Sequence, residues 1–350
     1  MFYTLKVKSN VFNFVLILLS VLALLFYIVF VDGIHNVLEV FLKCNPWWVF
    51  IGFFVFLLYL GLEVYILNIA LRIFGKKLNP LIGVKNCILG QFFNNITPSA
   101  TGGQPFQVFY MSKHGRVGYG VAVGALLIKF VCFQISLSVI CIFVLLLKLN
   151  YFLNKIQGFA VFMFLGFFIN IVIALALVLV GLNKKVTLFL LSFFAKLLSK
   201  FKMFKELENK LKGAEKEIDF FNSSIVLALK RKKEIFKMLL LSIIQLLVFY
   251  FINVVVAFVC GISLSFELAF NIMCGAACVQ MSSTFIPLPG AVGGAEFLYC
   301  AIYEGVFAPE KMSTALLLWR IYSFYFPIVL GLLIFKGLFV GRDKVNFDVK

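Results

Sequence analysis

A helix-breaking motif occurs twice inside the apolar part of this chain. The first copy is Pro98-Ser-Ala-Thr-Gly-Gly103 and the second is Pro289-Gly-Ala-Val-Gly-Gly294, so both read Pro-x-x-x-Gly-Gly. Lipid tolerates broken backbone only where protein or a watery cavity satisfies the freed N–H and C=O groups. One such segment in each half of a membrane protein is typical of a repeat-built transporter with its site between the breaks. The alternative is two unrelated Gly/Pro loops.

The composition predicts an all-α integral membrane protein. The chain is 63% hydrophobic and 13% charged, with a mean hydropathy of +1.06. Residues 11–31 carry no charge and are long enough to cross a bilayer, which takes about 20 apolar residues. Their apolar run is too long for a cleaved signal peptide, and no small-x-small site follows it. We therefore expect a first transmembrane helix there and a polytopic fold without a separate soluble domain.

The apolar segments predict about six full spans and two broken, re-entrant hairpins. The spans are expected near 11–31, 46–71, 117–147, 158–182, 238–260 and 314–336, and the hairpins near 81–112 and 266–308. If each hairpin instead crosses the membrane as two thin spans, the count rises to eight or more. With the N-terminus inside, four of the 32 Lys and Arg residues fall outside and two fall within spans, which leaves 26 inside. This asymmetry is what the positive-inside rule requires.

This topology predicts two inverted structural repeats within a single membrane domain, 1–350. The span 46–71 runs inward, so the hairpin 81–112 enters from the inside, whereas 238–260 runs outward and the hairpin 266–308 enters from the outside. The repeat halves 46–147 and 238–336 are then oppositely oriented. Both termini are expected in the cytoplasm, in a multi-pass protein of the cell (plasma) membrane.

The region between the halves, 183–237, is the only strongly polar part of the chain. It carries 14 Lys/Arg and six acidic residues, and apolar residues recur at spacings of three and four from Leu207 to Phe221, which predicts a cytoplasmic amphipathic helix. It is interpreted either as a linker that obeys the topology rules or as a surface that docks on anionic lipid. Nucleic acid is not an expected partner, because the bases adjoin membrane spans.

Five ionisable residues lie inside the apolar segments. Each costs roughly 2.5–3.5 kcal/mol at the centre of a span, so each is expected to face a partner or a cavity. Internal pairing and a polar binding site are both consistent with this pattern. The five residues are Glu63, Lys129, Glu296, Glu304 and Arg320.

Signatures of soluble enzymes and metal sites are missing. The sequence has no Gly-x-Ser-x-Gly, His-Glu-x-x-His, Gly-x-x-x-x-Gly-Lys or Gly-x-Gly-x-x-Gly motif, and its eight cysteines include no Cys-x-x-Cys pair. We therefore predict no catalytic residues, no metal and no cofactor.

Two long motifs carry a family resemblance. The segment 90–105, followed by Tyr110 to Gly115, resembles the first signature of the lysylphosphatidylglycerol synthase transmembrane (flippase-like) family, and 287–296 resembles its second. The resemblance covers nearly the whole chain and implies a stand-alone membrane module without the family's soluble aminoacyl-transferase domain.

The resemblance implies a protein that translocates a phospholipid or a lipid-linked headgroup, such as lysyl-phosphatidylglycerol, between leaflets. One alternative is the membrane part of a phosphatidylglycerol lysyltransferase or another lipid-modifying transferase that acts with a separate catalytic partner. Another is a scaffold that transports nothing. Expected partners are an anionic or aminoacylated phospholipid, the membrane and a separate lipid-modifying enzyme, with homo-oligomerisation left open.

We predict that the lipid-binding residues flank the two breaks and include the two intramembrane cations. Lys129 and Arg320 are expected to face the interior, and at least one of them is expected to hold the phosphate, while Glu63 and Glu296 orient them or meet a cationic headgroup. Helix N-termini at the breaks are expected to offer free N–H groups. For each polar side chain, hydrogen bonding between helices is the alternative. The predicted set is Gln91, Asn94, Asn95, Pro98, Gly102, Gly103, Gln104, Lys129, Gln280, Pro289, Gly293, Gly294, Glu296 and Arg320.

Overall fold

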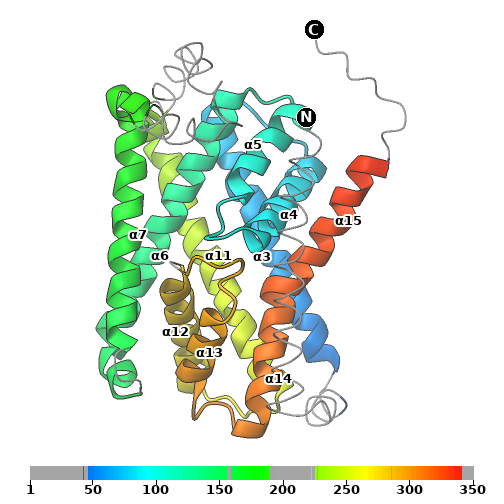
Figure 1. Ribbon diagram of the computed structural model, residues 1–350, viewed down its shortest axis with the longest axis vertical. Coiled ribbons are helices and arrows are strands. Elements are labelled where there is room, and N and C mark those ends of the chain that lie inside the picture. The colour runs from blue at the N-terminus through cyan, green and yellow to red at the C-terminus, as the bar shows by residue number, and fades with distance from the viewer. Residues whose placement is uncertain are drawn as a thin grey trace.

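The computed structural model describes residues 42, 46–155, 159–189, 192, 222, 225, 226, 228–284 and 286–340. The expected span 11–31 and most of the basic segment 183–237 lie outside this part of the chain. The described residues form a bundle of long helices with two shorter helical hairpins packed into it (Figure 1).

Five helical segments of the described part are long and apolar enough to cross a membrane. They coincide with five of the six spans expected from the sequence, so the protein is an all-α, polytopic membrane protein. Four are the single helices α3 (Pro46–Ile73), α6 (Tyr119–Lys155), α7 (Phe159–Leu182) and α11 (Lys232–Val259), and the fifth joins α14 (Pro309–Arg320), the π-helical turn η3 (Ile321–Tyr325) and α15 (Phe326–Val340).

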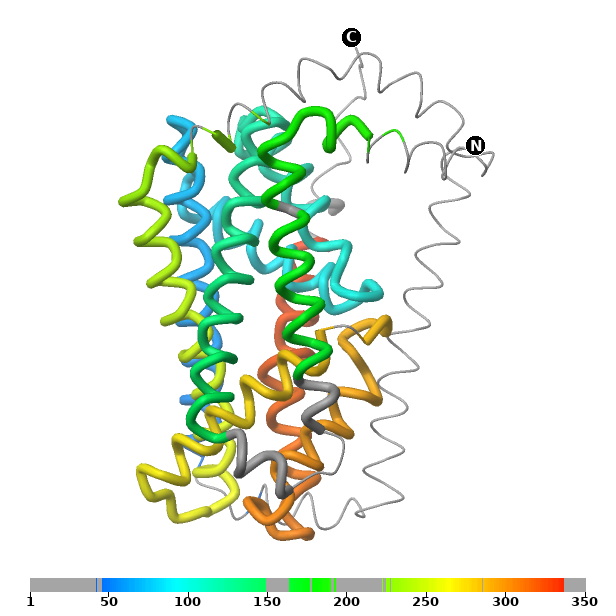
Figure 2. Tube along the Cα trace, turned by 90° about the vertical axis from the view of Figure 1, so that its left-hand side faces the viewer, coloured from blue at the N-terminus to red at the C-terminus, as the bar shows by residue number. Residues whose placement is uncertain are grey.

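Helices α3 and α11 pack against each other in opposite directions. Near the start of α3, Trp48 stacks on Phe258 of late α11 with ring centroids 4.4 Å apart. Further along α3, the hydroxyl of Tyr65 accepts a 2.8 Å hydrogen bond from the Lys237 ammonium at the start of α11. These contacts fix the antiparallel register of the central pair, against which α6 packs (Figure 2).

The two expected hairpins are present and meet at their tips. The first consists of α4 (Pro80–Ile96) and α5 (Gly103–His114), and the second of α12 (Phe266–Ser283) and α13 (Gly294–Tyr303). In Figure 1 they lie at opposite ends of the bundle and point toward each other. Between their tips, Pro98 and Pro289 form an isolated antiparallel bridge.

None of these four hairpin helices is among the candidate membrane spans of the described chain. At 1.5 Å per residue, the 12 residues of α5 extend only about 18 Å, against roughly 30 Å for the hydrocarbon core. The geometry therefore favours broken hairpins over two thin crossings.

The two sets of elements follow the same plan. A 28-residue helix, α3 or α11, precedes a hairpin whose arms have 17 and 12 residues in one case and 18 and 10 in the other. A long helical segment then completes each set. The last segment differs from α6 because it contains the π-helical turn η3. This turn ends at Tyr325, just before Pro327, which has no N–H donor for a regular helical turn.

Candidate functional site

A cavity of about 850 Å³ lies between the hairpins and the long helices. Its wall combines aromatic and aliphatic side chains with many polar ones, although the surrounding helices are strongly apolar. The polar side chains include Glu63, Gln91, Asn94, Asn95, Gln104, Gln107, Lys129, Gln134, Ser242, Gln245, Asn253, Gln280, Ser283, Thr284, Arg320 and Ser323.

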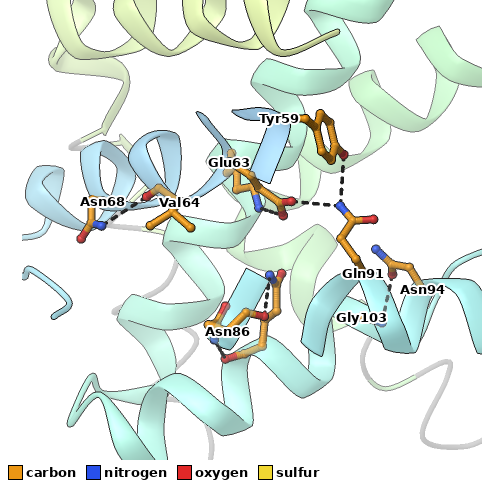
Figure 3. Close-up of polar contacts among 10 residues, drawn as sticks. Tyr59, Glu63, Val64, Asn68, Asn86, Gln91, Asn94 and Gly103 are labelled. Carbon is orange, nitrogen blue, oxygen red and sulfur yellow. Dashed lines mark hydrogen bonds and ion pairs between the residues drawn. The ribbon is translucent and has the colours of Figure 1, made fainter. Parts of the chain in front are cut away.

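The first charged group in the wall is an ion pair between α3 and α6. The Lys129 ammonium donates to Glu63 Oε1 over 2.6 Å, and only 14% and 7% of the two side chains are exposed. Gln91 of α4 completes the group, because its Nε2 donates to Glu63 Oε2 over 2.9 Å and to the Tyr59 hydroxyl over 3.1 Å (Figure 3). Three helices of the first set thus converge on one carboxylate.

The second charged group joins α13 and α14. Arg320 Nη2 lies 2.7 Å from Glu296 Oε1, and Arg320 Nη1 donates to the Gly290 carbonyl over 3.1 Å. The guanidinium carbon also lies 4.6 Å from the Trp319 ring centroid. Arg320 Nε has no hydrogen-bond partner among the described residues, so this buried cation retains an unused donor.

Glu296 contacts both the second hairpin tip and Arg320. Its Oε2 accepts a 2.7 Å hydrogen bond from the Gly293 amide at the start of α13, while its Oε1 faces Arg320. A carboxylate at a helix N-terminus is stabilised by the helix dipole. Glu296 therefore links the second hairpin tip to the cation, although it is not itself part of the cavity wall.

The two cations occupy equivalent places in the two sets of helices. Lys129 lies 26 positions after Gly103, and Arg320 lies 26 positions after Gly294. Each cation sits in the long segment that follows its hairpin, and each is paired with a carboxylate and lines the same cavity.

The hairpin tips offer fewer free N–H groups than the sequence suggested. Asn94 Oδ1 accepts from the Gly103 amide over 3.0 Å (Figure 3), and Thr97 Oγ1 accepts from the Gly102 amide over 2.8 Å. Together with the Glu296 cap, these bonds occupy the N–H groups that we expected to meet a lipid phosphate. The expectation was wrong for these three amides, because side chains within each hairpin cap the helix starts.

The turns at the tips hold uncommon backbone conformations that reach the cavity. Ser99, Ala100 and Ala291 have φ values of 51°, 53° and 52°, and all three line the cavity. Non-glycine residues rarely adopt this left-handed region, and such residues cluster at functional sites. The strained turns thus form part of the cavity wall.

The structure divides the predicted site residues into two groups. Seven of them line the cavity, namely Gln91, Asn94, Asn95, Gln104, Lys129, Gln280 and Arg320. The other seven form or hold the turns instead, namely Pro98, Gly102, Gly103, Pro289, Gly293, Gly294 and Glu296.

Four of the five charged residues form ion pairs with each other. Glu63, Lys129, Glu296 and Arg320 pair internally, as one interpretation expected, and three of them also line the cavity. Glu304 is an exposed residue at the end of α13 and lies outside the cavity wall.

Sequence reasoning missed several polar wall residues on the long helices. They are isolated in apolar sequence, so no motif marks them, and only their polarity at the middle of a span was a signal. They are Tyr59, Gln134, Ser242, Gln245, Asn253 and Ser323.

Comparison with known proteins places this arrangement in a family. Residues 14–331 match the family model described as the lysylphosphatidylglycerol synthase TM region. The chain is also 22% identical over 329 residues to a UPF0104 membrane protein of Methanocaldococcus jannaschii, covering 93% of this chain and 94% of that protein. No solved structure matches. With its span pattern, paired hairpins and charged cavity, the chain belongs to the lysylphosphatidylglycerol synthase TM region family.

Proposed function

We propose that this protein translocates a phospholipid, or a lipid-linked headgroup, between the two leaflets of the cell membrane. The observation that carries the proposal is the polar cavity of about 850 Å³ that holds two cations inside an apolar helix bundle. A charged headgroup crosses hydrocarbon only at high cost, so it needs such a polar enclosure, while its acyl chains can stay in lipid.

The arrangement of elements supports a two-fold, inverted-repeat design for the transporter. Each set contains a long helix, a broken hairpin and a second long segment with a cation at the same spacing. The hairpins enter from opposite ends and touch at Pro98 and Pro289 (Figure 1). Inverted repeats with a central site are the usual basis of alternating access to the two sides of a membrane.

Within this design, Lys129 and Arg320 bind the headgroup phosphate. Arg320 suits this role because its planar fork matches phosphate oxygens and the residue lines the cavity. Glu63 and Glu296 hold the two cations in place before the lipid arrives. The positive-inside pattern supports a cytoplasmic location for both termini.

The family description supports a second candidate, the membrane part of a lipid-modifying transferase. The matched model is the transmembrane region of a synthase, so a separate enzyme that lysylates or otherwise modifies the lipid would act as partner. In that case the cavity would present the lipid to the partner instead of moving it across the membrane.

Reconstitution tests the transport proposal. Liposomes that contain only the purified protein and a trace of tail-labelled phosphatidylglycerol or lysyl-phosphatidylglycerol are treated with a membrane-impermeant reagent that quenches outer-leaflet label. Rapid loss of label beyond half indicates translocation. We expect Arg320→Gln to reduce the rate at least tenfold, since one charge-assisted hydrogen bond is worth about 1.5–3 kcal/mol.

The matched control is Lys148→Gln. Lys148 lies at the far end of α6, where it pairs with the exposed Glu267 over 3.9 Å, outside the cavity wall. Its loss should leave the rate unchanged. Transport at the full rate by the Arg320 variant would remove Arg320 from the site. Absence of transport for every lipid, combined with lipid lysylation in the presence of lysyl-tRNA, would replace the transporter by the transferase.

A further inference from the structure

The two ion pairs of the site hold their carboxylates in different ways. Glu296 accepts from the Gly293 backbone amide at the start of α13 and lies outside the cavity wall. Glu63 lies in the wall, and its hydrogen-bond donors are two side chains, the Lys129 ammonium at 2.6 Å and the Gln91 amide at 2.9 Å. A side chain can turn away from its partner without any change in a helix, whereas the Gly293 amide is fixed by the backbone. Glu63 is therefore the carboxylate whose contacts can change inside the cavity.

The charges of the site are balanced before a headgroup enters. Lys129 and Arg320 each face one carboxylate, and Glu63 is the one acidic residue that the described part of the chain contributes to the cavity wall. A phosphodiester brings one negative charge into this enclosure. Because a buried charge without compensation is strongly unfavourable, one positive charge must accompany each phosphodiester.

The phosphate also competes with Glu63 for Lys129. The Lys129 ammonium lies 2.6 Å from Glu63 Oε1, and only 14% of the lysine side chain is exposed. A second anion beside this ammonium comes close to the Glu63 carboxylate, and like charges at that range disfavour each other. A proton on Glu63 removes both the excess charge and this repulsion, and it frees the ammonium to face the phosphate.

The surroundings of Glu63 hold few other groups that titrate near neutral pH. Lys237 of α11 also reaches α3, but it contacts the exposed Tyr65, which lies about 200° around the helix from Glu63. Residues 238–260 of α11 are uncharged. The other titratable side chains buried on the described α3, α4, α6, α11 and η3 have ordinary pKa values above about 8. They are Tyr59, Cys87, Cys132, Cys141, Tyr250 and Tyr322.

We infer that Glu63 takes up one proton when the headgroup phosphate binds and releases it when the phosphate leaves, so that each anionic headgroup crosses the membrane together with one proton. This inference rests on the proposed headgroup site and names the ion coupled to it. The proton comes from water on the side where the lipid enters and returns to water on the side where it leaves. For a lipid with one negative charge the movement is electroneutral, and a pH difference across the membrane can drive it.

Calorimetry tests the coupling separately from transport. Dihexanoyl-phosphatidylglycerol is titrated into the full chain in detergent, in two buffers that differ in their enthalpy of ionisation. Its phosphodiester does not titrate near neutral pH, so a buffer-dependent heat counts the protons bound by the protein. We expect about one proton taken up per lipid. Because binding that needs a proton weakens as the pH rises, the dissociation constant should increase about tenfold per pH unit wherever Glu63 is ionised without lipid and protonated with it.

Variants assign the proton to Glu63. Glu63→Gln is neutral in both states, so it should bind the lipid without proton uptake and with an affinity that does not depend on pH. Lys129→Arg keeps a charge that does not titrate, so it should still take up a proton. Glu267→Gln is the matched control, because Glu267 is 78% exposed and pairs with Lys148 outside the cavity wall. Its proton uptake should equal that of the unchanged protein.

Liposomes with a pH difference across the bilayer test the coupling during lipid movement. A trace of tail-labelled phosphatidylglycerol should collect in the leaflet that faces the more alkaline side. For one proton per lipid, the ratio between leaflets approaches about tenfold per pH unit. With Glu63→Gln, and in liposomes without protein, the label should not follow the pH difference.

Three results would overturn the inference and leave the headgroup site in place: lipid binding without proton uptake, proton uptake that persists in Glu63→Gln, or loss of proton uptake in Lys129→Arg, which would assign the proton to Lys129. If Glu63→Gln does not fold, the proton count of the unchanged protein and of Lys129→Arg still decides. A lipid that binds with a proton but does not move in liposomes would refute the proposed transport alone. Absence of binding at every pH would refute the headgroup site and the inference with it.

Discussion

At the scale of single residues, the main feature is that the four charged residues of the site form two ion pairs. Glu63 contacts Lys129 at 2.6 Å, and Glu296 contacts Arg320 at 2.7 Å. Pairing makes the charges tolerable inside an apolar bundle, while their position in the cavity wall leaves the cations accessible to a ligand. Removing one member of a buried pair is costly because the other charge remains.

The pair Glu63–Lys129 gives the first prediction. Glu63→Gln should lower the free energy of unfolding by about 3 kcal/mol, since it leaves a largely buried ammonium without its counter-ion. The measurement is chemical unfolding of the purified protein in detergent. The additional change Lys129→Met should restore much of the loss.

Glu267→Gln is the control for this prediction. Its ion pair with Lys148 spans 3.9 Å and the Glu267 side chain is 78% exposed, so the change should cost less than about 0.5 kcal/mol. If the Glu63 and Glu267 variants are equally stable, the first pair does not stabilise the bundle.

At the scale of elements, one glycine brings the second hairpin close to the segment formed by α14 and η3. The Gly290 carbonyl accepts from Arg320, and Gly290 has a φ of +58°, where a side chain is strained. A Cβ built at this position would lie 2.1 Å from the ring of Phe324 in η3. Only glycine permits this close approach of the loop to the helix.

Gly290→Ala should therefore lower the free energy of unfolding by about 3 kcal/mol, from left-handed strain and overlap together. Thermal unfolding in detergent, followed by circular dichroism, measures the change. Gly61→Ala provides the contrast, because Gly61 lies inside α3 and a Cβ there meets nothing within 4 Å. That variant should be about 0.5–1 kcal/mol more stable. Equal stability of the two variants would show that the approach of Gly290 is not required.

At the scale of the whole molecule, the two hairpins close on each other at the centre of the bundle. Pro98 and Pro289 are bridged although they are far apart in the sequence, and the cavity lies beside this contact. A transporter that alternates between two sides must change the contact between its halves. We therefore expect the tip contact to open and close during translocation.

A disulfide between the tips tests this expectation. Opposed residues of an antiparallel bridge have Cα atoms about 4.5–5.5 Å apart, within the range of a disulfide. In a background where the eight native cysteines are replaced, Pro98→Cys combined with Pro289→Cys should form an intramolecular cross-link on mild oxidation, detected by mass spectrometry. Lipid movement should stop on oxidation and return on reduction.

The single cysteine variants are controls and should respond to neither treatment. A cross-linked protein that moves lipid at the full rate would show that the tips stay together throughout transport. Failure of the cross-link to form would contradict the bridge itself.

The sequence by itself determined the membrane class, five of the described spans, the two hairpins and the residues at their tips, because hydrophobic length and helix-breaking residues act locally. It also identified the four residues of the two ion pairs, since charges stand out in apolar sequence. Only the tertiary structure decided that Glu63 pairs with Lys129, 66 positions away, and that capping side chains occupy the tip amides.

The tertiary structure also brought Asn253, Gln280 and Arg320 into one cavity wall. These residues lie on α11, α12 and α14, and nothing in the local sequence of a single polar residue tells whether it bonds a neighbouring helix or faces a cavity. The choice depends on which helix faces pack together and on which hydrogen-bond partners that packing supplies. The positions of the membrane segments thus follow from the sequence, whereas the polar site within them exists only where distant helices meet.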